Sequence, residues 1–209
     1  MGEFSAEPIR TARGAATRAR IVDAATDLMR VQGVANTSLD AVLAASKASK
    51  SQLYHYFADK DGLVLAVVQR QAERVLAAQE TLLRDLASLD DLRRWRDALV
   101  DLSRTTDCAG GCPLGSLVSE LAESPQPRAR LADGFARWEA YLVAGFRKIR
   151  GSAVPRPGVD LTELATATLA ALQGGLLLAQ TTRSTRPLEL ALDMAIEHVA
   201  ASLQAPAPG

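Results

Sequence analysis

Residues 37–63 read TSLDAVLAASKASKSQLYHYFADKDGL, and this stretch decides how the rest of the chain is interpreted. Thr37, with Asp40 three residues later, matches a capping box and predicts the start of a short helix. After a tight turn, Ser49 with Gln52 at the third position predicts the start of a second short helix. The spacing therefore predicts two short helices joined by a turn, which is a helix-turn-helix arrangement.

The start of the second short helix carries side chains suited to base recognition. In a helix-turn-helix the N-terminal residues of this helix face base edges in the major groove, and here they are Lys50, Ser51 and Gln52. Glutamine can pair with N6 and N7 of adenine. As a capping-box residue, however, Gln52 would point back at Ser49, and the sequence leaves both alternatives open.

Positive charge is concentrated in the same part of the chain. Residues 10–60 hold eight Lys or Arg against four Asp, whereas the 209-residue chain has 24 basic and 24 acidic residues and no net charge. Tyr54, His55 and Lys60 add groups that can bind phosphates. A local charge of +4 in a neutral protein predicts contact with a nucleic-acid backbone.

Apolar residues recur at helical spacing along nearly the whole chain, and sustained alternation is absent. We therefore expect an all-α fold of about nine helices. A three-helix helix-turn-helix domain is expected over residues 10–58 and a second helical domain over residues 59–203, with flexible tails at 1–9 and 204–209. Pro113 is expected at the first position of a sixth helix.

The last two expected helices, near 160–183 and 187–203, are apolar on more than one face. A helix of this kind must be covered on all sides, which predicts a homodimer interface. Two adjacent glycines inside the first helix indicate close backbone approach, and its apolar run is too short to span a bilayer. The expected interface residues are Leu169, Gly174, Gly175, Leu188, Leu192, Met194, Ala195 and Val199.

Several classes of protein are disfavoured. The chain has two histidines and shows no nucleophile elbow, phosphate-binding glycine loop or His-Glu-x-x-His pattern, so we expect no enzyme. No metal site and no cofactor are expected, because two cysteines and two distant histidines do not supply a zinc ligand set. Without a secretory signal or a membrane span, a cytoplasmic protein is expected.

At this point the motif from Thr37 to Leu63 resembles the DNA-binding module of the tetracycline-repressor (TetR) family. The specific part is LYHYF followed by Lys60, and the resemblance in architecture covers about 15–203. Lys47 and Ser51 depart from it, since glycine is usual at both positions, and Lys47 is expected to adopt positive φ. The resemblance implies DNA contacts from Thr37, Ser38, Lys47, Ser49, Lys50, Ser51, Gln52, Tyr54, His55 and Lys60.

The resemblance also implies that the second domain binds a small-molecule effector, whose identity the sequence does not give. We expect an apolar pocket with a few polar groups, suited to a hydrophobic or aromatic compound. Its expected lining residues are Trp95, Leu99, Leu102, Cys112, Leu117, Leu121, Trp138, Leu142, Phe146, Thr168, Leu172, Gln173 and Leu176. Each of these residues could equally well belong to a closed core.

Both cysteines lie in the stretch CAGGCPLG at 108–115. They are expected to pack, to line the pocket, or to sense oxidants or electrophiles through Cys112, whose place beside a helix N-terminus can lower a thiol pKa. The favoured interpretation is a repressor that binds a palindromic operator as a dimer and is released by its ligand. The alternatives are a thiol-based sensor on the same scaffold and a helical binding module that never contacts DNA.

Overall fold

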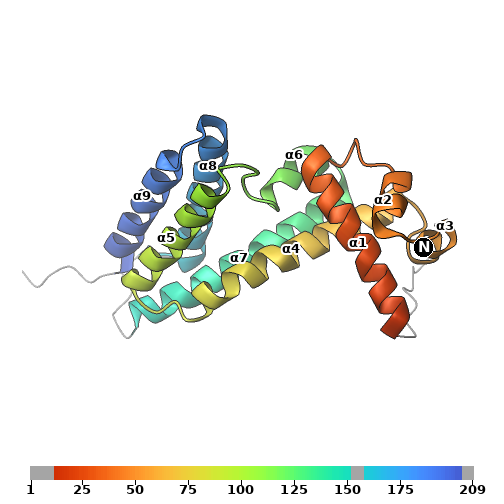
Figure 1. Ribbon diagram of the computed structural model, residues 1–209. Helices are drawn as coiled ribbons and strands as arrows, with labels where there is room; N and C mark the ends of the chain where they lie inside the picture. Colours follow the sequence, from red (N-terminus) through yellow and green to blue (C-terminus); the bar gives the residue numbers. More distant parts are fainter. Residues whose placement is uncertain (1–11, 152–157, 204–209) are drawn as a thin grey trace, which may run out of the picture.

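The computed structural model describes residues 12–151 and 158–203, and within these ranges the chain contains helices and no strand (Figure 1). The expected tails at 1–9 and 204–209 lie outside the described residues. The all-α prediction is confirmed, since the described ranges hold nine α-helices and one short 3-10 helix, η1. They are α1 Ala12–Gln32, α2 Leu39–Ser46, α3 Lys50–Tyr56, α4 Lys60–Arg84, α5 Leu89–Thr105, η1 Gly115–Leu117, α6 Val118–Leu121, α7 Pro125–Arg150, α8 Leu161–Thr182 and α9 Arg186–Leu203.

Helices α1, α2 and α3 form one end of the molecule (Figure 1). Ser38 rather than Thr37 caps α2, with its hydroxyl accepting from the N–H of Ala41 at 3.1 Å. The expected cap at Thr37 is wrong because that side chain is buried and donates to the carbonyl of Gly33 at 2.8 Å. The expected capping box of α3 is confirmed, with both reciprocal hydrogen bonds present.

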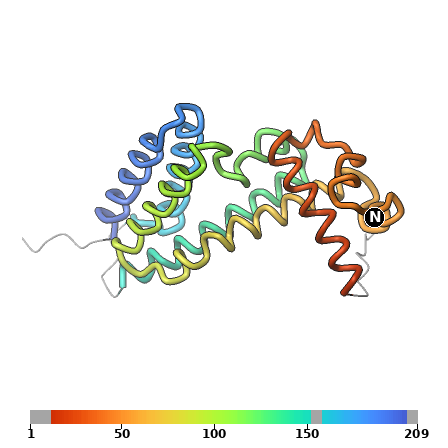
Figure 2. The backbone as a smooth tube through the Cα atoms, in the orientation of Figure 1, coloured from red at the N-terminus to blue at the C-terminus, as the bar shows by residue number. Residues whose placement is uncertain are grey.

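Helix α4 connects this end to the rest of the molecule. It begins at an Asp59 cap, as expected, and runs beside α7 toward the far end (Figure 2). Gly145 of α7 packs against Leu86, in the segment that follows α4, so closely that a Cβ added to this glycine would clash with the leucine side chain. One continuous hydrophobic core extends from Ile21 in α1 to Leu203 in α9.

The segment after α5 differs from the expectation. Pro113 does not begin a regular helix, because Leu114 turns inward and is completely buried. The chain instead forms a turn, then η1 and then a single turn of α6. Helix α7 starts at Pro125, which occupies the first helical position after Ser124.

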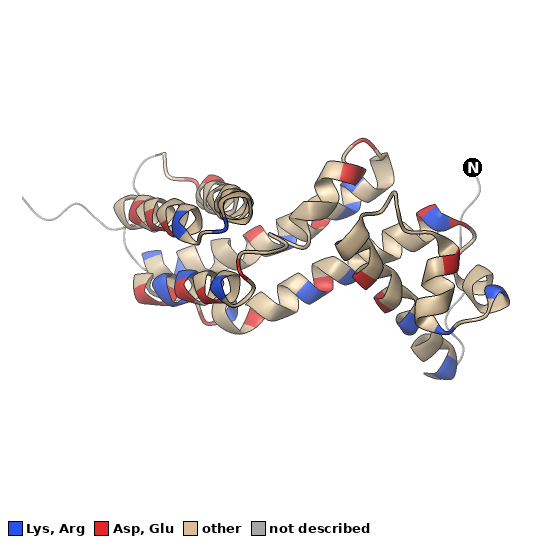
Figure 3. Cartoon of the chain, turned by 45° about the horizontal axis from the view of Figure 1, so that its top comes forward, with Lys and Arg blue, Asp and Glu red and all other residues tan. Residues whose placement is uncertain are grey.

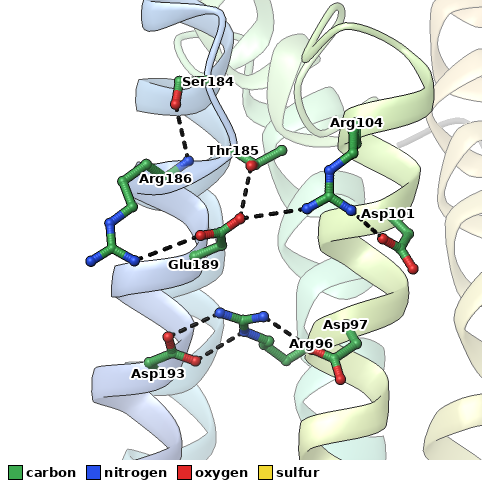
Figure 4. A network of polar contacts seen from close by, with 9 residues as sticks. All are labelled: Arg96, Asp97, Asp101, Arg104, Ser184, Thr185, Arg186, Glu189 and Asp193. Carbon is green, nitrogen blue, oxygen red and sulfur yellow. Dashed lines mark hydrogen bonds and ion pairs between the residues drawn. The ribbon is translucent and has the colours of Figure 1, made fainter.

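Helices α5, α8 and α9 pack at the other end (Figure 1). Ion pairs join α5 to α9: Arg96 forms a bidentate pair with Asp193, at 2.9 Å for both hydrogen bonds, and Arg104 lies 3.7 Å from Glu189 (Figure 4). Helix α8 is long and apolar enough to cross a membrane by length and composition, so the expectation that it is too short to span a bilayer is wrong. Of its 18-residue apolar window, 39% is buried inside the chain. It packs here against α7 and α9.

Candidate DNA-binding surface and ligand cavity

The N-terminal residues of α3 lie on the surface of the molecule. Lys50, Ser51 and Gln52 are exposed, and so are Tyr54 and His55 farther along the helix. Several lysine and arginine residues lie at this end of the molecule, and others are spread over the remaining helices (Figure 3). The arrangement offers a positively charged helix start to a DNA groove.

Gln52 takes the capping conformation. Its Oε1 accepts from the N–H of Ser49 at 2.9 Å, while the Ser49 hydroxyl accepts from the N–H of Gln52 at 3.2 Å. The amide NH₂ of Gln52 has no partner in these two bonds. The hydrogen bond to Ser49 fixes the carbonyl oxygen of the Gln52 side chain. Base contact through its NH₂ group stays a prediction.

Lys47 adopts positive φ, as expected from its place in the turn. It is the C-cap of α2, with φ 53° and ψ 30°, in the left-handed region that favours glycine. Its side chain is exposed beside α3. The turn therefore keeps its geometry and gains a cation at the cost of backbone strain.

Four further expected DNA contacts, Thr37, Ser38, Ser49 and Lys60, differ in accessibility. Thr37 is 1% exposed, so it supports the loop between α1 and α2 from inside and is not available to DNA. Ser38 is exposed, and Ser49 is exposed at the cap of α3. Lys60 is partly buried, and its ammonium group donates to the carbonyl of Ala35 at 3.3 Å.

An ion-pair network fixes α1 against α4. Asp23 accepts from Arg70 at 2.7 Å and 3.1 Å and from Arg74 at 2.8 Å, and Arg74 also pairs with Asp27. Burial alone would raise the pKa of Asp23, but the hydrogen bonds and charges of the two arginines outweigh it and lower the pKa below its ordinary value. The network holds the helix-turn-helix to the long helix that leaves it.

A cavity of about 340 Å³ opens between α4, α5, α7 and α8. The loop that joins α5 to η1 closes one side, and Arg30 of α1 reaches its edge. Its lining residues are Arg30, Gln71, Arg74, Val75, Ala78, Gln79, Leu99, Leu102, Ser103, Thr106, Cys108, Ala109, Gly110, Gly111, Cys112, Pro113, Trp138, Leu176 and Ala179. The size is within the range of small-molecule sites.

Some of the expected pocket residues line this cavity, and others do not. Those that line it are Leu99, Leu102, Cys112, Trp138 and Leu176. Those that lie elsewhere are Trp95, Leu117, Leu121, Leu142, Phe146, Thr168, Leu172 and Gln173. Most of the second group are closed in the core, whereas Thr168 borders a separate hollow between α8 and α9.

Sequence reasoning missed the polar side of the cavity. Gln71 and Gln79 are buried on α4 and both line the cavity, with Val75 between them. Gln79 also accepts from Nε1 of Trp95 at 2.7 Å, which places Trp95 behind the lining. Gln71 and Gln79 lie four positions on either side of Val75, so the three residues share one face of a helix. This spacing of polar residues on an apolar face could have predicted the polar side of the cavity.

Both cysteines belong to the cavity lining. Both are buried free thiols, and Cys112 Sγ accepts from the N–H of Gly115 at 3.3 Å. Asp107 and Cys108 adopt positive φ, at 52° and 53°. No group of three or more His, Cys, Asp or Glu in the described ranges is placed to hold a metal ion.

The outer face of α8 and α9 is apolar and exposed. It carries Leu177 and Leu178 from α8 and Leu190 and Met194 from α9, each more than half exposed. Gly174 faces open space on this side. Met194 and Gly174 are thus the expected interface residues that lie on the free face.

The other expected interface residues pack inside the chain. Leu169, Gly175, Leu188, Leu192, Ala195 and Val199 are buried among the described residues. A Cβ placed on Gly175 would lie 2.9 Å from Cα of Leu188, so this glycine allows α8 to approach α9. These six residues were expected to face a partner chain, and that expectation is wrong. They pack against other elements of their own chain.

Comparison with known proteins agrees with this architecture. Residues 21–67 match the bacterial regulatory proteins of the tetR family, and residues 88–194 match the C-terminal domain of LmrA/YxaF-like transcriptional regulators. An uncharacterized HTH-type transcriptional regulator of Mycobacterium tuberculosis is 33% identical over 180 residues, covering 83% of this chain and 89% of the relative. The HTH-type transcriptional regulator LmrA of Bacillus subtilis is 27% identical over 177 residues, covering 82% and 90%.

Among solved structures, a TetR-family transcriptional regulator from Cytophaga hutchinsonii superimposes with a TM-score of 0.77 at 20% identity, covering 94% of this chain and 100% of that one. This likeness shows the shared fold, while the sequence matches extend over both the helix-turn-helix and the helices that surround the cavity. The chain belongs to the TetR family of transcriptional regulators.

Proposed function

We propose that this regulator is a repressor that binds a palindromic operator as a homodimer in the cytoplasm and releases it when a small molecule fills the cavity. The observation that carries the proposal is that one helix serves both sites. Helix α4 begins beside α3 at Lys60 and lines the cavity with Gln71, Val75 and Gln79. A ligand that favours a different position of α4 changes the position of the DNA-binding helices.

The dimer is proposed to form through the outer face of α8 and α9. Four of its side chains, Leu177, Leu178, Leu190 and Met194, are large, apolar and exposed. Exposed apolar groups gathered on one pair of helices indicate a protein interface. Pairing two such helices from each chain places two recognition helices on one DNA duplex, about one helical turn apart.

The lining of the cavity limits the effector. Among the described residues its lining contains no Asp or Glu, and the charged members are Arg30 and Arg74, the latter paired with Asp23 and Asp27. An organic cation therefore lacks a counter-charge there. We propose an apolar, neutral or anionic compound whose polar groups face Gln71, Gln79 and Ser103.

The test begins with duplex DNA enriched from random sequence by the full-length protein, and with its affinity measured at several salt concentrations. Lys50→Ala is expected to weaken binding by about tenfold, in line with the loss of one good contact. Arg147→Ala, at an exposed position in the last turn of α7, is the control and is expected to leave affinity unchanged. Failure to enrich any duplex, or an affinity insensitive to salt, contradicts the proposal.

A thiol-based sensor on the same scaffold is a second candidate, supported by the position of both cysteines in the cavity lining. An electrophile with an activated carbon–carbon double bond that enters the cavity can add to a thiol there: a sulfur–carbon bond forms, the π bond opens, and the thiol proton goes to the neighbouring carbon. Cys112→Ser is then expected to abolish the response of DNA binding to the electrophile. Retention of the full response in the double variant Cys108→Ser/Cys112→Ser rejects this candidate.

A further inference from the structure

A carboxylate of α6 holds the loop between α1 and α2. Oε1 of Glu120 accepts from the N–H of Val34 at 3.1 Å, and Oε2 accepts from the N–H of Ala35 at 3.0 Å. The partners are 86 and 85 residues apart in sequence, and α6 lies beside the C-terminal end of α1 (Figure 1). Two hydrogen bonds to one ionised acceptor form a strong and directional contact.

The loop is shaped to receive this carboxylate. Gly33 follows α1 with φ +85°, and a Cβ placed on it would lie 3.2 Å from both carboxylate oxygens of Glu120. A side chain at this position would strain the backbone and crowd the carboxylate. Glycine therefore allows the turn and the close approach of Glu120 together.

The same loop positions residues of the DNA-binding surface. Thr37 is hydrogen-bonded to Gly33, Ser38 caps α2, and the ammonium group of Lys60 donates to the carbonyl of Ala35. Holding the amides of Val34 and Ala35 thus fixes the start of α2 and the anchor point of Lys60. In the proposed function, the start of α2 and Lys60 both belong to the surface that binds DNA.

On its other side, Glu120 is connected to the cavity by a short and irregular segment. Residues 108–113 line the cavity, and the N–H of Ser116 donates to the carbonyl of Cys112 at 2.9 Å. The 3-10 helix η1 then leads directly into α6. A displacement of the cavity loop therefore reaches Glu120 within two helical turns of chain.

We propose that Glu120 is a positioning residue that couples the cavity to the DNA-binding helices. It holds the loop between α1 and α2 in one arrangement, and an occupant that displaces residues 108–113 moves Glu120 and loosens that loop. This regulation rests on the proposed function and adds a second connection beside α4. Its physical basis is that Glu120 hydrogen-bonds the DNA-binding domain and that η1 joins Glu120 to the cavity loop along the chain.

The test uses the full chain, with N-ethylmaleimide as the occupant of the cavity. The thiol adds across the maleimide double bond, so a sulfur–carbon bond forms and the proton goes to the neighbouring carbon. Cys108 and Cys112 are the two cysteines of the sequence and both line the cavity, which directs the adduct there. Hydrogen exchange of the Val34 and Ala35 amides is measured by NMR before and after labelling.

Labelling is expected to accelerate exchange of both amides by about tenfold or more, which is a decrease of about 1.4 kcal/mol or more in the free energy of local opening. In Glu120→Gln the two amides are expected to exchange fast before labelling and to change little afterwards. The side-chain NH₂ of the glutamine would face a backbone N–H, and two donors cannot form a hydrogen bond. Glu123→Gln removes the same charge from an exposed residue one turn away and is expected to behave like the wild type. Cys108→Ser/Cys112→Ser is expected to show no effect of the reagent.

Two results overturn the proposal: equal exchange in Glu120→Gln and Glu123→Gln, or unchanged exchange of Val34 and Ala35 in fully labelled wild-type protein. DNA affinity gives the separate readout. If labelling weakens binding in wild type and in Glu123→Gln but not in Glu120→Gln, coupling through Glu120 is supported. A protein that enriches no duplex rejects the proposed function, while the exchange measurements still decide the role of Glu120.

Discussion

At the scale of single residues, the left-handed backbone conformation of Lys47 lowers the stability of the turn between α2 and α3. A lysine in the left-handed region costs about 1–2 kcal/mol, and glycine removes that cost while losing more backbone entropy on folding. Lys47→Gly is therefore expected to raise the free energy of unfolding by about 0.5–1 kcal/mol. Urea denaturation measures the difference.

The matched control for this change is Lys50→Gly. Lys50 is the first residue of α3, where glycine is expected to destabilise the protein by about 0.5–1 kcal/mol. Equal destabilisation by both substitutions contradicts the strain argument. A gain in stability that comes with weaker DNA binding indicates that the Lys47 side chain serves the proposed phosphate contact.

Asp23 makes stability depend on pH. Its pKa is lowered in the folded protein, so its contribution is present above the ordinary carboxyl value near 3.9 and is lost as pH falls through the lowered value. Because the three side chains are 33–39% exposed, Asp23→Asn is expected to cost only about 1 kcal/mol at pH 7. The deficit is expected to shrink as the pH falls below the ordinary carboxyl value, and urea denaturation across pH measures it.

Asp27→Asn is the comparison for this prediction. Asp27 pairs with Arg74 alone and its side chain is 63% exposed, so its substitution is expected to have a smaller effect. A deficit for Asp23→Asn that does not shrink at any pH below the ordinary carboxyl value at which the protein still folds contradicts an electrostatic origin.

At the scale of helices, two adjacent glycines of α8 have opposite surroundings. Gly175 faces the backbone of α9 at Leu188, where an added Cβ would lie 2.9 Å from Cα. A Cβ added at Gly174 would instead point into open space among the described residues. Gly175→Ala is expected to destabilise the protein by about 1–3 kcal/mol through overpacking. Gly174→Ala is expected to stabilise the helix by up to about 1 kcal/mol.

Thermal and urea unfolding of the two variants, at one protein concentration, gives this comparison. If Gly175→Ala is as stable as Gly174→Ala, the close approach of α8 and α9 is wrong. A stabilising effect of Gly174→Ala on unfolding, joined to weaker dimer association, indicates that the proposed partner packs against that glycine.

At the scale of the whole molecule, local signals predicted the helices and the DNA-binding motif well. The capping box of α3 and the turn at Lys47 depend on residues close together in sequence, and both are present. The short α6 was not predictable, because the inward turn at Leu114 depends on α4 and α7, where an added Cβ on Gly134 would lie 3.1 Å from the leucine. Helical spacing alone does not show such distant packing.

The same limit applies to the cavity and the outer face. Leu188 and Leu192 lie four residues apart and form one apolar stripe of α9, and Leu190 and Met194 form another. The spacing does not show which of the two stripes packs against the rest of the chain. The structure places the first pair inside and leaves the second pair exposed. Likewise, a leucine in a closed core and a leucine on a cavity wall have the same sequence signal.

The exposed stripe leads to a prediction about assembly. Met194 is 64% exposed on the outer face of α9, and Met194→Glu places a charge where the proposed interface must exclude water. The variant is expected to elute with the mass of a single chain in light scattering and to lose operator affinity on the order of 100-fold, because the two half-sites are no longer linked. Val31→Glu makes the same change on α1, at a side chain 74% exposed, and is expected to remain dimeric. If Met194→Glu keeps the mass of two chains, the interface lies on another face of the molecule.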